Sequence, residues 1–76
     1  MSNLESKVYN LLQFRNFKDK MTFHAHYLTA MNYFKIDHPI RTGLTEDYTA
    51  AWIINYMAAH YHYIPYLPDG ANSHTP

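Results

Sequence analysis

The sequence predicts an all-α fold: a small three-helix domain with a short proline-containing C-terminal extension packed back on the helices. Three stretches repeat apolar residues at the three- and four-residue spacing of a helix, and a residue type that favours helix N-caps stands before each stretch. All four prolines fall between or after these stretches, where helices end. We therefore expect a single helical domain over residues 1–70. Residues 71–76 have no apolar side chain larger than alanine and are expected to form a flexible tail.

The first predicted helix starts at about Asn3. Ser2 and Glu5 match a capping box, in which two residues three apart satisfy each other's backbone N–H groups. The direction of the apolar stripe changes at Phe14, so the helix either ends near this residue or continues with two apolar faces. The first stripe consists of Leu4, Val8, Leu11 and Leu12.

The second predicted helix has Asp19 or Thr22 as its N-cap. It stops at residues 37–39, because the residue before a proline avoids the α conformation. The pattern is that of an ordinary amphipathic helix. Its apolar side carries Phe23, Tyr27, Ala30, Met31 and Phe34, and its opposite side carries His26, Thr29 and Asn32.

The third predicted helix begins after Thr45, a favourable N-cap, and runs to about residue 62. Glu46 and Asp47 stand in its first turn, where the helix dipole favours negative charge. A helix that is apolar on most sides is typical of a buried helix. Two neighbouring helices would leave one side to the C-terminal extension, a second copy or another protein. One side carries Ala50, Ile53, Ile54, Met57 and Tyr61, and another carries Tyr48, Trp52, Tyr56 and Ala59.

The length and charge of the chain, together with the lack of a targeting signal, indicate where the protein acts and whether it needs a partner. A domain of 76 residues buries only about 60% of its unfolded surface, so association with another chain would help to stabilise it. The chain has no cysteine, and six basic residues balance six acidic ones. The N-terminus lacks a signal-peptide pattern, and no apolar run reaches the length of a membrane span. We expect a cytoplasmic protein.

Protein binding is the function that the sequence favours. Aromatic residues recur every four residues along one side of the third helix, and Tyr and Trp are common at binding hot spots. The alternative is that these rings complete the core of the monomer. Phe14, Phe17 and Met21 form the second stripe of the first helix, and the two phenylalanines are also left over. The predicted partner-binding residues are Tyr48, Trp52, Tyr56, Phe14 and Phe17.

We therefore expect a non-enzymatic protein–protein interaction module, a small regulator or inhibitor. It would act as a homodimer or by docking on a larger protein. Small stand-alone regulators of this size are common on phages and other mobile elements, which suggests such an origin.

Catalysis and cofactor binding find little support. The three serines lie near the termini and there is no cysteine, so no nucleophilic triad is apparent. Gly43 and Gly70 are the only glycines, and neither belongs to a phosphate-binding loop. We predict no catalytic residue, no cofactor and no metal ligand.

Nucleic-acid binding is the first alternative. Residues 14–20 interleave aromatic rings with positive charge, as single-strand binding surfaces do. The contacts would come from Arg15, Lys18 and Lys20. Against this, the chain is neutral overall, and the helix that would enter a groove begins with two acidic residues.

A histidine-ligated metal site is the second alternative. His24 and His26 are two residues apart, as are His60 and His62. Side chains two apart on a helix diverge, whereas chelation from one helix needs a spacing of three or four. An extended backbone over residues 60–64 would bring the second pair onto one face. The six histidines would also allow a pH-sensing role.

Overall fold

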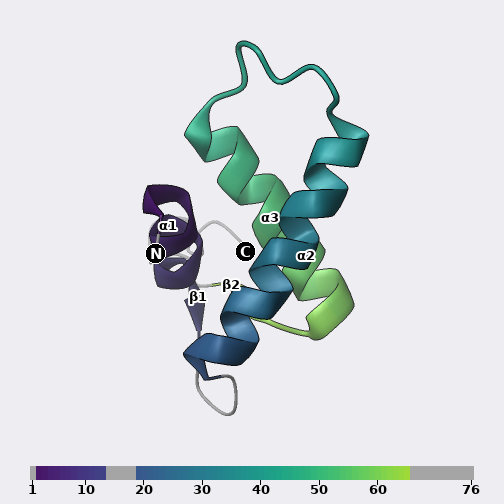
Figure 1. Ribbon diagram of the computed structural model, residues 1–76. Helices are drawn as coiled ribbons and strands as arrows, with labels where there is room; N and C mark the ends of the chain where they lie inside the picture. Colours follow the sequence, from purple (N-terminus) through teal and green to yellow (C-terminus); the bar gives the residue numbers. More distant parts are fainter. Residues whose placement is uncertain (1, 14–18, 66–76) are drawn as a thin grey trace, which may run out of the picture.

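The computed structural model describes residues 2–13 and 19–65 and confirms the all-α, three-helix fold (Figure 1). The long helices α2 and α3 run in opposite directions and pack together, and α1 lies to one side of them. Two short strands form one antiparallel pair beside the helices. The elements in chain order are α1 (Asn3–Asn10), β1 (Leu12–Gln13), α2 (Lys20–Asp37), α3 (Glu46–Tyr61) and β2 (Ile64–Pro65).

Each helix starts at a side chain that caps it. The Ser2 hydroxyl accepts a hydrogen bond from the Glu5 N–H at 3.1 Å, and the Asp19 carboxylate accepts one from Thr22 at 2.7 Å. At α3, the Thr45 hydroxyl accepts from the Tyr48 N–H at 3.0 Å. Each cap satisfies a backbone donor that the helix itself leaves unpaired. The expected starts are thereby confirmed, and Asp19 is the cap of α2. The bond from Thr22 lowers the pKa of Asp19.

The helix ends follow the sequence less closely. The second helix stops at Asp37, as expected, and the His38 N–H closes it on the Phe34 carbonyl at 2.8 Å. The first helix ends at Asn10, short of the end expected near residue 14. It stops early because Leu12 leaves the helix to pair with Pro65.

The two strands connect the ends of the helical core. Leu12 lies opposite Pro65, and Gln13 lies opposite Ile64. The first residues of the C-terminal extension therefore return to the segment that follows α1. Residues 66–76 lie outside the described residues, as does the predicted domain boundary at residue 70.

All three helices contribute to one core. Phe23 is fully buried at its centre, with its ring 5.1 Å from Tyr9 and 6.3 Å from Tyr63, both edge-on. Fully burying a large apolar side chain contributes about 1.5–3 kcal/mol. The buried cluster consists of Val8, Leu12, Phe23, Tyr27, Ala30, Ala50, Ile53, Met57 and Tyr63.

Two residues of this core region differ from expectation. His26 was predicted to face away from the core, but it is partly buried and its ring stacks on Tyr61 at 3.7 Å. This prediction was wrong because the C-terminal end of α3 and the buried ring of Tyr63 cover that side of α2. Tyr63 lies after the end of α3, where helical spacing gives no signal.

No helix among the described residues is long and apolar enough to cross a membrane.

Candidate protein-binding surface

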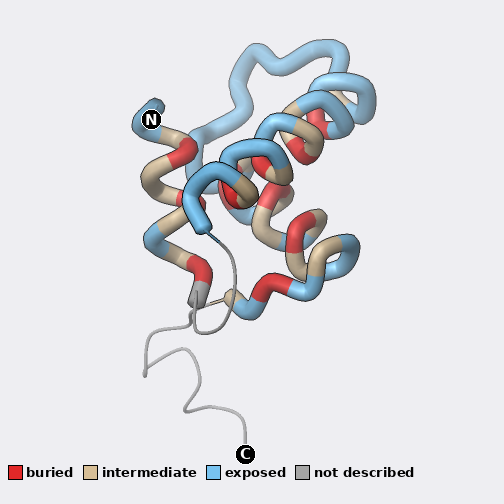
Figure 2. The backbone as a smooth tube through the Cα atoms, turned by 60° about the horizontal axis from the view of Figure 1, so that its bottom comes forward, coloured by how far each residue is buried: buried red, intermediate tan, exposed pale blue. Residues whose placement is uncertain are grey.

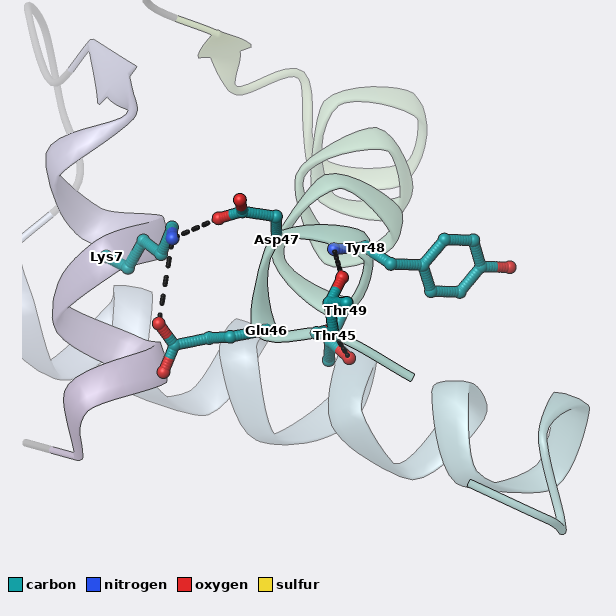
Figure 3. Close-up of polar contacts among 6 residues, drawn as sticks. All are labelled: Lys7, Thr45, Glu46, Asp47, Tyr48 and Thr49. Atoms are coloured by element: carbon teal, nitrogen blue, oxygen red, sulfur yellow. Dashed lines mark hydrogen bonds and ion pairs between the residues drawn. The ribbon is translucent and has the colours of Figure 1, made fainter. Parts of the chain in front are cut away.

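The first turn of α3 is held to α1 by charge (Figure 3). Lys7 forms ion pairs with Asp47 and, at 3.6 Å, with Glu46. The hydrogen bond with Asp47 raises the pKa of Lys7. The ring of Tyr48 points to the opposite side of α3, away from Lys7. The two acidic residues therefore fix the start of α3, and the next residue begins an aromatic surface.

Aromatic rings line the edge where α2 and α3 meet. Three of them, Tyr48, Trp52 and Tyr56, stand four residues apart on α3 and so share one side of the helix. Helix α2 contributes rings that pack against them. We call this set the aromatic seam: Tyr33 and Phe34 from α2, His38 from the C-cap of α2, and Tyr48, Trp52 and Tyr56 from α3.

Ring packing fixes the middle of the seam. The indole of Trp52 meets Phe34 edge-on with centroids 5.4 Å apart, and it stacks on Tyr56 at 5.7 Å. Tyr56 in turn stacks on Tyr33 at 5.5 Å. Aromatic pairs of this kind are worth about 0.5–1.5 kcal/mol each beyond the area they bury. Trp52 and Tyr56 are therefore held rigidly and are only partly exposed.

His38 fixes one end of the seam. Its Nδ1 lies 3.1 Å from the carbonyl oxygen of Phe34, and its Nε2 lies 3.0 Å from the hydroxyl of Tyr48. A carbonyl only accepts, so Nδ1 carries the proton, and in the neutral ring Nε2 accepts from the Tyr48 hydroxyl. This contact joins the end of α2 to the start of α3.

The seam is partly core and partly surface. Tyr33 is 51% exposed and Tyr48 is 46% exposed, whereas Phe34 is buried. Burial among the neighbouring rings, followed by the effects of Tyr61 and Tyr33, raises the pKa of Tyr56. The side of α3 that the sequence left open thus packs against α2 at its inner edge and faces outward at Tyr48, and Tyr33 of α2 is exposed beside it.

Beyond Tyr56 the aromatic contacts continue to the end of α3. The ring of His60 stacks on Tyr56 at 4.1 Å. His26 stacks on Tyr61, and its Nδ1 lies 3.0 Å from the hydroxyl of Tyr63. Tyr63 is almost fully buried, and burial raises its pKa to about 12. These histidines act in packing and hydrogen bonding.

A buried carboxylate is the feature that the sequence analysis missed. Glu5 is only 4% exposed, and its carboxylate lies 2.7 Å from Nδ1 of His24. The capping-box pattern accounts for the backbone of Glu5 but gives no sign that its side chain is covered. The nineteen-residue separation explains why spacing within one helix could not reveal the pair.

Of the three predicted nucleic-acid contacts, Lys20 lies among the described residues. Its ammonium lies 5.8 Å above the ring of Tyr9, a cation–π contact on α1. The other predicted contacts, Arg15 and Lys18, lie outside the described residues, as do the predicted partner-binding residues Phe14 and Phe17.

Three of the four histidines of the metal alternative contact other side chains of the chain. His24 meets Glu5, and His26 meets Tyr63. His60 lies on Tyr56, whereas His62 is the exposed C-cap of α3 in a left-handed conformation. Within residues 2–13 and 19–65, no group of three or more His, Cys, Asp or Glu side chains is placed to hold a metal ion.

No protein-family model, curated protein or solved structure matches this chain.

Proposed function

We propose that this chain is a non-enzymatic protein-binding module, a small cytoplasmic regulator or inhibitor that docks on a larger protein through the aromatic seam. The observation that carries the proposal is the pair of exposed rings, Tyr33 and Tyr48, on either side of the partly exposed Trp52 and Tyr56. Aromatic residues are the side chains most enriched at binding hot spots.

Rigidity supports this use of the seam. Rings already fixed by stacking lose little conformational freedom when a partner covers them, which lowers the entropic cost of binding. The hydroxyl of Tyr33 can meet a backbone carbonyl or amide of the partner, and the hydroxyl of Tyr48, which donates to His38, can still accept from an amide N–H. The same surface thus offers apolar area and directional hydrogen bonds.

The experiment compares three forms of the tagged chain in a pull-down from the native host. The test variant, Tyr33→Ser with Tyr48→Ser, removes the two exposed rings and leaves Trp52 and Phe34 in place. The control, Ile64→Ser, removes an apolar side chain of matching exposure (48%) away from the seam. Circular dichroism should show that all three forms are folded.

The wild-type chain and the control should capture the same protein in about equal amounts. The double variant should lose at least about tenfold in affinity for that protein once it is purified, the equivalent of about 1.4 kcal/mol. Equal binding by the double variant, or capture of no protein by any form, would contradict the proposal.

A further inference from the structure

His38 lies at one end of the aromatic seam, where α2 gives way to the loop that leads to α3. Its side chain is 16% exposed, whereas the other residues of 35–48 are exposed (Figure 2). Phe34 stacks on its ring with centroids 4.3 Å apart, and Tyr48 and Trp52 meet it edge-on at 5.6 Å and 5.9 Å. The imidazole is therefore held in place by its neighbours and keeps some access to solvent.

The two ring nitrogens of His38 face different chemical groups. Nδ1 faces two acceptors, the Phe34 carbonyl oxygen at 3.1 Å and the Asp37 carboxylate at 3.8 Å. The proton of the neutral ring therefore belongs on Nδ1, and Nε2 has only a lone pair. Because Nε2 lies 3.0 Å from the hydroxyl oxygen of Tyr48, that hydroxyl donates its hydrogen to the imidazole.

The direction of this hydrogen bond decides what Tyr48 offers to a partner. A phenol hydrogen lies in the plane of the ring, and a lone pair of the oxygen occupies the other in-plane position. With the hydrogen directed at His38, the free in-plane position is an acceptor. Tyr48 is 46% exposed, so a partner on the seam can approach its hydroxyl. The group that fits there is an N–H donor.

Protonation of His38 reverses the hydrogen bond. An imidazolium has an N–H on both nitrogens, so Nε2 becomes the donor and the Tyr48 oxygen becomes its acceptor. The phenol hydrogen then takes the other in-plane position, where it faces the partner's N–H instead of accepting from it. Histidine side chains take up this proton between about pH 8 and about pH 5.

The groups around the imidazole are compatible with both states. Asp37 of α2 can balance the positive charge of the imidazolium. From the loop, the guanidinium of Arg41 donates to the His38 carbonyl oxygen at 2.8 Å. From α3, the uncharged rings of Tyr48 and Trp52 face the imidazole. The Tyr48 hydroxyl takes either role, so the contact persists when the proton is added.

We propose that the His38–Tyr48 pair makes the aromatic seam select a partner that donates an N–H to Tyr48, and that protonation of His38 weakens this binding. The inference rests on the proposal that the seam binds protein. It adds the hydrogen-bonding chemistry of the partner and a dependence on pH. The reversal needs no partner and therefore also occurs in the free chain.

The reversal is tested in the free, ¹⁵N-labelled full chain by NMR of the histidine ring nitrogens. At about pH 8, His38 should carry a hydrogen on Nδ1 and none on Nε2, and at about pH 5 it should carry one on each. A hydrogen on Nε2 instead of Nδ1 at the higher pH, or a ring that stays neutral at the lower pH, would overturn the inference.

The consequence for binding is tested by measuring the affinity for the captured protein at the same two pH values. His38→Gln provides an amide oxygen that accepts from Tyr48 at either pH. The wild-type chain should weaken at least about fivefold more than this variant when the pH falls, because a donor then faces a donor. Groups that titrate on the captured protein affect both forms alike.

Two further variants control the comparison. Tyr48→Phe lacks the hydroxyl and should bind more weakly than the wild-type chain at about pH 8, with the small pH dependence of His38→Gln. His62→Gln removes an exposed histidine at the C-cap of α3 and should keep the full wild-type change. Circular dichroism should show that each form is folded at both pH values.

This inference and the proposed function fail in different ways. An equal change with pH in the wild-type chain and His38→Gln, or tighter wild-type binding at the lower pH, would overturn the inference and leave binding at the seam standing. If no protein is captured, the seam proposal fails and the selection fails with it. The NMR spectra still decide whether the hydrogen bond between His38 and Tyr48 reverses.

Discussion

At the scale of the single residue, the contribution of a side chain to the free energy of unfolding depends on whether it is buried in the core or exposed on the surface. Ile53 is fully buried, whereas Ile40 is 81% exposed in the loop between α2 and α3. Both are isoleucines, so one substitution can compare the two environments. The sequence separated them by helical spacing alone, because Ile53 repeats with Ala50 and Met57 and Ile40 belongs to no stripe.

Ile53→Ala should lower the free energy of unfolding by about 2–5 kcal/mol, because it leaves a cavity among the helices. Urea denaturation monitored by circular dichroism measures the change. The matched variant, Ile40→Ala, should change the free energy by less than about 0.5 kcal/mol. Similar losses from both variants would mean that α3 does not pack as described.

Tyr63 makes the free energy of unfolding decrease as the pH rises in the alkaline range. Burial raises its pKa from 10.0 to about 12 in the folded chain. Its stabilising effect is therefore fully present below pH 10 and is lost as the pH rises through about 12, because the unfolded chain gives up the proton first. The same direction holds for Tyr27, whose pKa burial also raises.

Urea denaturation at pH 8 and at about pH 11 should show this loss of stability in the wild-type chain. Tyr63→Phe lacks the titrating hydroxyl and should show a smaller loss over the same interval. The variant also lacks the contact with His26, so its stability at pH 8 is the reference for its own pH curve. An equal pH dependence in both chains would contradict the burial of Tyr63.

At the scale of the element, the helix starts could be predicted and several other features could not. Ser2, Asp19 and Thr45 act within three residues of their own position, so local spacing is enough to find them. The pairing of Leu12 with Pro65 joins residues far apart in the chain and leaves no local pattern. The early end of α1 follows from that pairing and was missed for the same reason.

The aromatic seam was found from the sequence only on its α3 side. The four-residue spacing of Tyr48, Trp52 and Tyr56 showed that they share one side. It could not show that Tyr33 of α2 and the C-cap residue His38 pack against them, since this depends on how the two helices meet. The covered position of His26 and the buried Glu5 depend on tertiary contacts in the same way.

His62 ends α3 in a left-handed conformation, with φ of 63°. A side chain with a Cβ atom is strained in this region by about 1–2 kcal/mol, whereas glycine is not. His62→Gly should therefore raise the thermal unfolding midpoint by a few degrees, in part offset by the greater freedom of glycine in the unfolded chain. Differential scanning calorimetry measures the midpoint.

The matched control for this prediction is His60→Gly. This residue lies in the last turn of α3 with helical geometry, and its ring stacks on Tyr56; glycine is a poorer helix former and removes this contact, so the variant should lower the midpoint. A fall in the midpoint for both variants would show that residue 62 does not adopt the left-handed conformation in solution.

At the scale of the whole molecule, one core leaves two separate surfaces on α2 and α3. The core draws on one side of each helix, whereas Met21, Leu28 and Ile36 of α2 and the rings at the edge between α2 and α3 stay exposed. Small domains bury a limited fraction of their surface, and binding to another chain stabilises the folded state by mass action.

Binding of the partner at the aromatic seam can be tested by a two-dimensional ¹H–¹⁵N NMR spectrum of the labelled chain, recorded free and with the purified captured protein. We expect the largest changes at Tyr33, Tyr48 and Tyr56, together with the indole N–H of Trp52. Large changes on α1 or at Met21, Leu28 and Ile36 of α2, with the seam signals unchanged, would show that the partner binds elsewhere.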